Sequence, residues 1–343
     1  MNSYQRVMNT LGGLPVDRLP VFAVLGAHGA GITGCDQRTL YSDPAAYLAG
    51  QKAVRQSYGF DLVLAPFDFS AISEAFGGET AWGGLQTPNV KRYPARSIAQ
   101  ALSLPVPSPS TARLSVALDA TRELARCYKE EVPVIAVLPG PGILPALLTG
   151  LECWMEGVLF EPDQAARLLD HSAGFLVAFA NALLQAGADC LVFTEGMASA
   201  EIAPRGLFVD AILPHLAGIL GAIDGPKVIS STGGRMNHTL DLLPGLPGVV
   251  GAIVGSKDDL AESRRLSPPG FNLIGNLDNL AFASADAGEI GRIALERLSV
   301  AAPAGHFVLA NSGGDLPRDT PAANLKALRE SVLRYPAGAG EGA

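Results

Sequence analysis

Three side chains that can hold a proton follow apolar runs of this chain: His28, Asp68 and Glu195. Imidazole and carboxyl groups are the usual general acids and bases of enzymes. Glu195 comes after Val192 and Phe193, and burial beside such apolar residues raises the pKa of a carboxyl group. We therefore expect the three residues to be catalytic, with Glu195 able to protonate a leaving group. The alternatives are a hydrogen-bonding rim residue for Glu195 and an exposed position on a mobile loop for His28.

Small and polar residues after other apolar runs are expected to contact a substrate. They are Gly140, Gly142, Ser230, Thr232, Asn276, Asp278, Asn311 and Asp315. In the turn at 139–142 (PGPG), glycine removes side-chain bulk and proline fixes φ, which suits the close approach of a ligand. A stiff turn between a strand and a helix is the alternative for this segment. A structural role is the alternative for Asn276, Asp278, Asn311 and Asp315.

Eight short apolar runs must position these residues. They are 19–25, 61–66, 132–138, 189–194, 227–231, 249–254, 271–275 and 306–310. Their lack of alternation is typical of parallel strands covered on both faces. The segments between them carry apolar residues at helical spacing, most clearly at 163–186. Eight strand–helix units in 343 residues predict an α/β fold of the (β/α)₈ TIM-barrel type. An open doubly wound sheet is the alternative.

A barrel of this type brings the candidate residues together, because active sites lie at the C-terminal ends of its strands. We predict one domain over residues 1–335 and a disordered, Gly- and Ala-rich tail at 336–343. The Pro- and Ser-rich stretch at 105–111 is expected to be a surface loop before a helix that starts near Ala112.

Composition excludes several classes of partner. The net charge is −8 and no Lys/Arg cluster occurs, so we expect no nucleic-acid partner. The N-terminus lacks the apolar core of a signal peptide, and no apolar stretch approaches the roughly 20 residues of a membrane span, so a cytoplasmic location is expected. The four cysteines share no metal-binding spacing, and we expect buried or inert thiols.

Residues 29–34 (GAGITG) match the pattern G-x-G-x-x-G of dinucleotide-binding sites. The context differs, because the next expected helix begins near Asp43 and no acidic residue ends a second strand about 20 residues further on. The segment is therefore predicted to be a flexible loop that could cover the barrel mouth.

A set of short motifs resembles the uroporphyrinogen decarboxylase superfamily, particularly its corrinoid-linked methyltransferase branch. The motifs run from about residue 4 to 333 and include FDLVLAPFD at 60–68, EAFGG at 74–78, GPG at 140–142, AGAD at 186–189, GNLD at 275–278, and LP, TP and Asn324 after the eighth run. The resemblance implies a distorted (β/α)₈ barrel and places Asp68 facing the substrate, and orientation of a pterin or an amide is the alternative role for Asp68. It also implies methyl transfer with a corrinoid (cobalamin) on a partner protein or free in solution.

The chain departs from both branches of that family. The arginine-rich signature of the decarboxylases is missing at 26–31 (GAHGAG), so a polyanionic porphyrinogen would lack partners. The zinc motif H-x-C-G of the methyltransferases aligns with 230–233 (SSTG), and their later cysteine aligns with Gly314. Because hydroxyl groups are poor zinc ligands, we expect no zinc at the usual site. A relocated site built from His28, Asp68 and Glu195 is the alternative.

The leading hypothesis is a methyltransferase or demethylase component that works with a corrinoid protein and a small methylated ether, amine or folate. A homodimer is possible within this hypothesis. One alternative is a decarboxylase or lyase that acts on a small acid without corrinoid. The other is a barrel that binds a ligand but has no catalytic activity.

Overall fold

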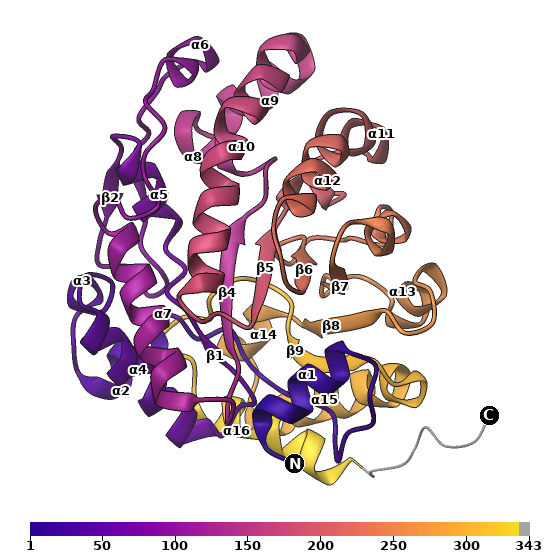
Figure 1. The fold of residues 1–343 in the computed structure, drawn as a ribbon. Coiled ribbons are helices and arrows are strands. Elements are labelled where there is room, and N and C mark those ends of the chain that lie inside the picture. The colour runs from indigo at the N-terminus through magenta and orange to yellow at the C-terminus, as the bar shows by residue number, and fades with distance from the viewer. Residues whose placement is uncertain (336–343) are drawn as a thin grey trace.

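A computed structural model describes residues 1–335 and shows seven parallel strands in one curled sheet (Figure 1). The predicted disordered tail at 336–343 lies outside the described residues. The strand order follows the chain, and every neighbouring pair is parallel. The strands are β1 (Val63–Leu64), β4 (Val134–Pro139), β5 (Cys190–Thr194), β6 (Lys227–Ser230), β7 (Val249–Ile253), β8 (Asn272–Leu277) and β9 (Phe307–Asn311).

The first apolar run, 19–25, closes the sheet although it forms no regular strand. Its one bridge joins Val21 to Leu309 in parallel, and Phe22 N donates to Leu309 O at 3.1 Å. On its other side, Asp61 N donates to Val21 O at 2.9 Å just before β1. Pro20 has no N–H to contribute to a ladder. The run therefore occupies the eighth place between β9 and β1, and the predicted barrel is confirmed.

Helices cover the outside of the sheet, as the crossover connections of a barrel require (Figure 1). The longer ones are α4 (Pro44–Tyr58), α7 (Leu114–Tyr128), α9 (Leu151–Phe160), α10 (Pro162–Gln185), α12 (Leu213–Gly221), α15 (Ala287–Ala301) and α16 (Ala322–Arg334). Shorter helices include α5 (Phe69–Ala75), α6 (Ile98–Leu102), α8 (Leu144–Thr149), α11 (Arg205–Leu207), α13 (Leu260–Leu266) and α14 (Asn279–Ser284).

The helix predicted at 163–186 is α10, and its apolar stripe faces inward. Five of the seven stripe residues are buried, namely Leu169, Phe175, Leu176, Phe179 and Leu183. Ala166 and Leu184 are only half-buried. The loop predicted at 105–111 is also present, and the helix after it begins at Leu114.

Helix α1 (Ser3–Leu11) covers the N-terminal ends of the strands. Tyr4 N donates to Glu131 O at 2.9 Å, just before β4, and Asn272 Nδ2 at the start of β8 donates to Leu11 O at 3.2 Å. The opposite end, where the strands finish, is the end at which active sites of barrel enzymes lie.

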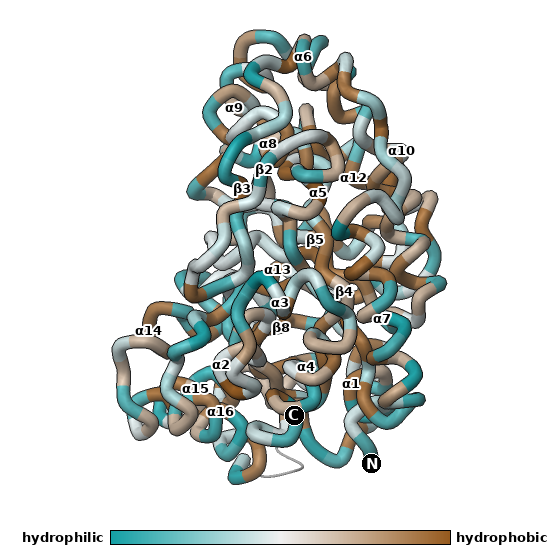
Figure 2. Tube along the Cα trace, turned by 90° about the vertical axis from the view of Figure 1, so that its left-hand side faces the viewer, coloured by the Kyte–Doolittle hydropathy of each residue, from teal (hydrophilic) through white to brown (hydrophobic). Residues whose placement is uncertain are grey.

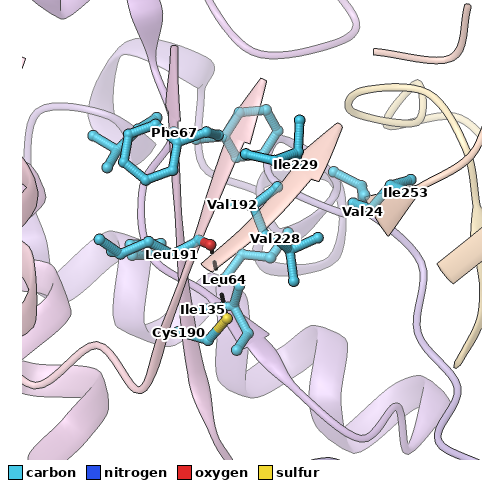
Figure 3. Packing of buried hydrophobic residues seen from close by; sticks show 14 of the residues in the cluster. Val24, Leu64, Phe67, Ile135, Cys190, Leu191, Val192, Val228, Ile229 and Ile253 are labelled. Atoms are coloured by element: carbon cyan, nitrogen blue, oxygen red, sulfur yellow. Dashed lines mark hydrogen bonds between the residues drawn. The ribbon is translucent and has the colours of Figure 1, made fainter. Parts of the chain in front are cut away.

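Apolar side chains from distant parts of the chain fill the barrel. Val24, Leu64, Val192 and Ile253 belong to one buried cluster (Figure 3). Along the chain trace, β4 and β5 are hydrophobic while the outer segment at β3 is more hydrophilic (Figure 2). Burial of this cluster drives closure of the sheet.

The segment with the dinucleotide-like pattern forms a helix, so the prediction of a flexible loop is wrong. Residues from His28 to Thr33 form α2, and a further short helix, α3 (Gln37–Leu40), follows. A Cβ atom at Gly29 would lie 2.7 Å from Gly50 Cα in α4. This glycine therefore permits close packing of α2 on α4.

An antiparallel hairpin, β2 (Glu79–Ala81) and β3 (Asn89–Arg92), follows α5 and was not expected from the sequence.

All four cysteines are free thiols. Burial raises the pKa of Cys190 to about 12, as an inert thiol requires, whereas Cys127 is exposed. In the part of the chain from 1 to 335, no helix combines the length and apolar composition needed to cross a membrane.

Candidate active site

The strands bring Asp68, Glu195 and Asn276 to one edge of the barrel. Asp68 follows β1, Glu195 comes directly after β5, and Asn276 lies near the end of β8. All strands are parallel, so these positions share the C-terminal edge. Each of the three residues is buried, with exposed fractions of 9%, 0% and 0%.

Glu195 is held by two backbone N–H groups in an otherwise apolar environment. Gly142 N donates to Glu195 Oε2 at 2.8 Å, and Met197 N donates to Oε1 at 3.0 Å. Complete burial raises the pKa of Glu195 to about 7, although the two N–H groups oppose the shift. The raised pKa expected from the apolar neighbours is therefore present, and near neutral pH this carboxyl can both give and take a proton.

The glycines of the turn at 139–142 make room for the Glu195 carboxyl group. A Cβ atom at Gly142 would lie 2.5 Å from Glu195 Oε1, and one at Gly140 would overlap Oε2. On the other side, Glu195 N donates to Ser230 O at 2.7 Å and fixes the backbone to β6. The space left by Gly140 and Gly142 is thus filled by Glu195 in this structure.

Asp68 forms an ion pair that the sequence did not indicate. Its side chain caps α5 by accepting from Ser70 N at 2.9 Å, and it pairs with Arg113, which also binds Glu74 at 2.9 Å. Burial raises the pKa of Asp68, while the charge of Arg113 opposes the shift. The Arg113 guanidinium group lies 4.7 Å from the ring centroid of Trp82, so the ion pair also contacts the segment after β2.

A cavity of about 20 Å³ adjoins this ion pair and is lined by Asp68, Arg113 and Tyr41 among others. That volume holds about one water molecule. The Tyr41 hydroxyl group is buried and has no hydrogen-bond partner within residues 1–335. Burial and the nearby Asp315 raise the pKa of Tyr41 well above its usual value, so the hydroxyl stays protonated. Tyr41 was missed because nothing in its local sequence distinguishes it from a packing residue.

Asp315 is a third buried acid at the same edge. It accepts from Gly26 N at 2.6 Å and from Ala27 N at 3.0 Å. Burial raises its pKa to about 7. The Tyr41 hydroxyl lies beside the same segment, since a Cβ atom at Gly26 would be 2.7 Å from Tyr41 Oη.

Asn276 presents an unused acceptor. Its Nδ2 donates to Gly255 O at 2.8 Å and to Asp258 O at 3.1 Å, whereas its buried Oδ1 has no partner in the described chain. A buried acceptor without a partner is costly, so this oxygen is well placed to receive a hydrogen bond from a ligand.

Asn311 and Asp278 are engaged in structural hydrogen bonds. Asn311 Oδ1 accepts from Val24 N at 2.8 Å and thereby ties β9 to the first apolar run. Asp278 caps α14 and accepts from Leu280 N at 2.9 Å. Both contacts agree with the structural alternative for these residues.

The residues at the zinc-motif positions do not fit a zinc ion. Ser230 Oγ accepts from Thr232 N at 3.1 Å, and the Thr232 side chain is exposed on a residue with φ of 61°. Zinc requires thiolate, imidazole or carboxylate ligands. Within residues 1–335, no group of three His, Cys, Asp or Glu side chains is arranged to hold a metal ion. The alternative zinc site built from His28, Asp68 and Glu195 is therefore not formed in this structure.

His28 is buried at the start of α2, so the alternative of an exposed position on a mobile loop is wrong, while its catalytic role stays a prediction. Its Nε2 lies 2.8 Å from Tyr58 Oη at the end of α4. Burial lowers the pKa of His28. The imidazole contacts a helix outside the barrel, and it makes no hydrogen bond or ion pair with Asp68 or Glu195.

A (β/α)₈ barrel with a buried carboxyl of near-neutral pKa at its C-terminal edge has the features of a barrel enzyme. The chain belongs to the uroporphyrinogen decarboxylase family, because the sequence model of that family, described as Uroporphyrinogen decarboxylase (URO-D), matches residues 2–335. The family resemblance inferred from the short motifs is therefore confirmed.

Known relatives agree with the methyltransferase branch. The chain is 26% identical to the methylcobamide:CoM methyltransferase MtaA of Methanosarcina barkeri, over 94% of this chain and 95% of that protein. It is 28% identical to MtbA of Methanosarcina mazei, a protein of the same description, over 64% of this chain and 66% of the relative. The match to MtbA therefore spans just under two thirds of that protein. These names bear out the prediction of an enzyme of the methyltransferase type.

A solved structure described as a methyltransferase from Methanosarcina mazei has the same fold. It superposes with a TM-score of 0.86 over 98% of this chain and 99% of that chain, at 22% sequence identity. This likeness confirms the predicted barrel over its full length.

Proposed function

We propose that this chain moves a methyl group between a corrinoid carrier and a small O- or N-methylated substrate at the C-terminal mouth of the barrel. Family membership and the methylcobamide:CoM methyltransferases among the relatives support methyl transfer with a corrinoid. The observation that carries the choice of substrate is Glu195, a buried carboxyl whose pKa is raised to about 7.

Glu195 supplies the proton that the leaving group needs. In demethylation of an ether, amine or methylated folate, a bound corrinoid would accept the methyl group and supply the electron pair of the new bond. The C–O or C–N bond breaks and its electron pair stays on the departing atom. The Glu195 carboxyl group donates its proton to that atom and is protonated again from solvent.

The poor fit to zinc favours an oxygen or nitrogen leaving group over a thiol. Activation of a thiol requires its deprotonation, which a metal ion assists. The residues at the zinc-motif positions, Ser230 and Thr232, carry only hydroxyl groups. A protonated carboxyl performs the opposite task, since it stabilises a departing alkoxide or amine.

Other residues at this edge bind and position the substrate. Tyr41 Oη and Asn276 Oδ1, which have no hydrogen-bond partner among residues 1–335, offer a donor and an acceptor for a polar group. Asp315 provides a second proton-holding group beside Tyr41. Gly140 and Gly142 act through Glu195, and Asp68 acts through its ion pair with Arg113, so these three are positioning residues.

The test is demethylation under anaerobic conditions with cob(I)alamin, either free or bound to a purified corrinoid protein. The panel contains methyl ethers, methylamines, methylated folates and methyl thioethers. We expect loss of the cob(I)alamin absorption with an O- or N-methyl donor and formation of the demethylated product. The proposal fails if folded protein demethylates none of the O- or N-methyl donors with either form of cobalamin, and activity on methyl thioethers alone would contradict the choice of substrate. Release of carbon dioxide from a small acid without corrinoid would instead support the decarboxylase alternative.

A further inference from the structure

A pocket of about 440 Å³ lies at the end of the barrel opposite to Glu195, where the strands begin, since Glu131 and Val132 in its lining directly precede β4. Its walls come from α1, from the end of α4 and from α16, and so from both ends of the chain. Four arginines line it: Arg6, Arg18, Arg55 and Arg329. The chain as a whole carries a net charge of −8, so this gathering of cations is not a general property of its surface. The volume suits a small ligand.

Two of the four arginines are neutralised within the protein. Arg6 Nη1 lies 2.9 Å from Asp61 Oδ1, and Arg18 Nη1 lies 2.7 Å from Asp61 Oδ2. Arg6 also pairs with Asp17 at 2.7 Å. The buried Asp61 therefore joins Arg6 and Arg18 just before β1, and these contacts use most of their donor groups.

The other two arginines, Arg55 and Arg329, form no ion pair with an acidic residue of the described chain. Arg55 Nη2 donates to Ser3 Oγ at 3.0 Å, and Arg329 Nε donates to Gly59 O at 3.2 Å. Over residues 1–335, neither guanidinium group has a carboxylate within the 4.0 Å limit of an ion pair. Glu131 also lines the pocket, but its side chain is exposed. Burial lowers the pKa of Arg55, and the charges of Arg329 and Arg18 act in the same direction, whereas the charge of Asp61 opposes the shift.

We propose that this pocket binds a small dianion of the phosphate type, through Arg55 and Arg329. Each guanidinium group has five N–H donors, and only one of each is used here. The two neighbouring guanidinium groups repel one another. An anion between them offsets that repulsion and accepts hydrogen bonds from their unused N–H groups. A phosphate dianion matches two guanidinium charges, whereas a carboxylate neutralises only one.

Calorimetric titration of the full chain with inorganic phosphate tests the proposal. Phosphate-free buffer is used, and ionic strength is held constant with potassium chloride because salt screens such contacts. We expect saturable binding with one site per chain and much weaker binding of acetate. A phosphate monoester such as glycerol phosphate is the second probe. Tighter binding of the monoester than of phosphate would identify a phosphorylated metabolite as the source of the group, and equal or weaker binding would identify free phosphate.

Arg55→Gln and Arg329→Gln should each weaken phosphate binding at least about tenfold, because each removes charge-assisted hydrogen bonds. Arg334→Gln is the matched control in α16, since Arg334 pairs with the exposed Glu330 and does not line this pocket. Its affinity for phosphate should equal that of the parent protein.

Binding without saturation, equal binding of phosphate and acetate, or equal losses in Arg334→Gln and Arg329→Gln would overturn the proposal. Circular dichroism confirms that each variant is folded before titration. If Arg55→Gln does not fold because its contact with Ser3 is lost, Arg329→Gln still decides the outcome. The readout is binding alone, so the result does not depend on the proposed methyl transfer.

Discussion

The backbone N–H of Gly142 donates to Glu195 Oε2 at 2.8 Å, across 53 residues of sequence. The same glycine leaves the space that the carboxyl group occupies, since a Cβ atom there would lie 2.5 Å from Oε1. One turn after β4 therefore holds and accommodates the acid after β5. The Glu195 carboxyl group is thus fixed in an apolar environment at the end of β5, where burial raises its pKa to about 7.

Glu195→Gln should slow methyl transfer by about 100-fold or more, because the amide cannot supply the proton that a general acid gives. The side chain keeps its shape and one acceptor oxygen, but its amide nitrogen faces one of the two backbone N–H donors, so a loss of stability of about 1–3 kcal/mol is expected. Single-turnover rates with cob(I)alamin, compared with a thermal melt of the same sample, check this expectation. A folded variant with the parental rate would remove Glu195 from the proposed mechanism.

Gly142→Ala should lower the free energy of unfolding by about 1–3 kcal/mol through the clash with the Glu195 carboxyl group. Gly218→Ala is the matched control, because no atom lies within 4 Å of the added Cβ and the residue is inside α12. The control should be stabilised by about 0.5–1 kcal/mol. Urea unfolding of both variants measures the difference, and equal stability would contradict the close packing.

The free energy of unfolding should fall as pH rises from about 4.5 to about 7. Burial raises the pKa of Glu195 from 4.5 to about 7 and that of Asp315 from 3.8 to about 7. In this window the folded protein holds protons that the unfolded chain has released, so raising the pH favours unfolding. Above about pH 7 these two groups no longer contribute to the slope.

Glu195→Gln isolates its share of this pH dependence. Removal of one such group should reduce the slope by at most about 1.4 kcal/mol per pH unit between pH 5 and 7. Asp315→Asn should act in the same direction. Urea unfolding at several pH values gives the slopes, and slopes identical to that of the parent protein would show that neither carboxyl holds a proton in the folded state.

Asp68→Asn should lower the free energy of unfolding by about 1–3 kcal/mol, because it leaves Arg113 without one of its charged partners. The amide oxygen retains the cap of α5, so Asp68→Ala should cost about 1 kcal/mol more. The exposed pair of Arg122 with Asp119 is the control, and Arg122→Gln should change stability by less than about 1 kcal/mol. Thermal or urea unfolding measures all three variants.

The same Asp68→Asn variant also separates positioning from direct catalysis. If Asp68 acts only through Arg113, the methyl-transfer rate of the folded variant should fall by less than in Glu195→Gln. An equal or larger loss at a temperature where the variant is fully folded would show that Asp68 touches the reacting groups.

Chelators should leave methyl transfer unchanged. The hydroxyl residues Ser230 and Thr232 stand where the zinc motif would supply its ligands, and zinc requires thiolate, imidazole or carboxylate groups. Elemental analysis of untagged protein should find far less than one zinc ion per chain, and 1,10-phenanthroline should not inhibit. Stoichiometric zinc with loss of activity on its removal would contradict this prediction.

The apolar runs predicted the strands because a strand buried on both faces requires continuous hydrophobic residues. That property depends only on neighbouring residues in the sequence. The helix at 163–186 was equally clear, since its apolar spacing matches the period of a helix. Local apolar residues also predicted the raised pKa of Glu195. In the same way, the family motifs indicated the barrel and the branch to which the relatives belong.

Only the tertiary structure decided which distant groups meet. Arg113 pairs with Asp68 across 45 residues, and His28 contacts Tyr58 although its sequence suggested a mobile loop. Arg55 and Arg329 face one pocket from α4 and α16. Such contacts depend on how the barrel closes and on the direction in which each helix packs. Local composition specifies strands and burial, but it carries no information on those long-range geometries.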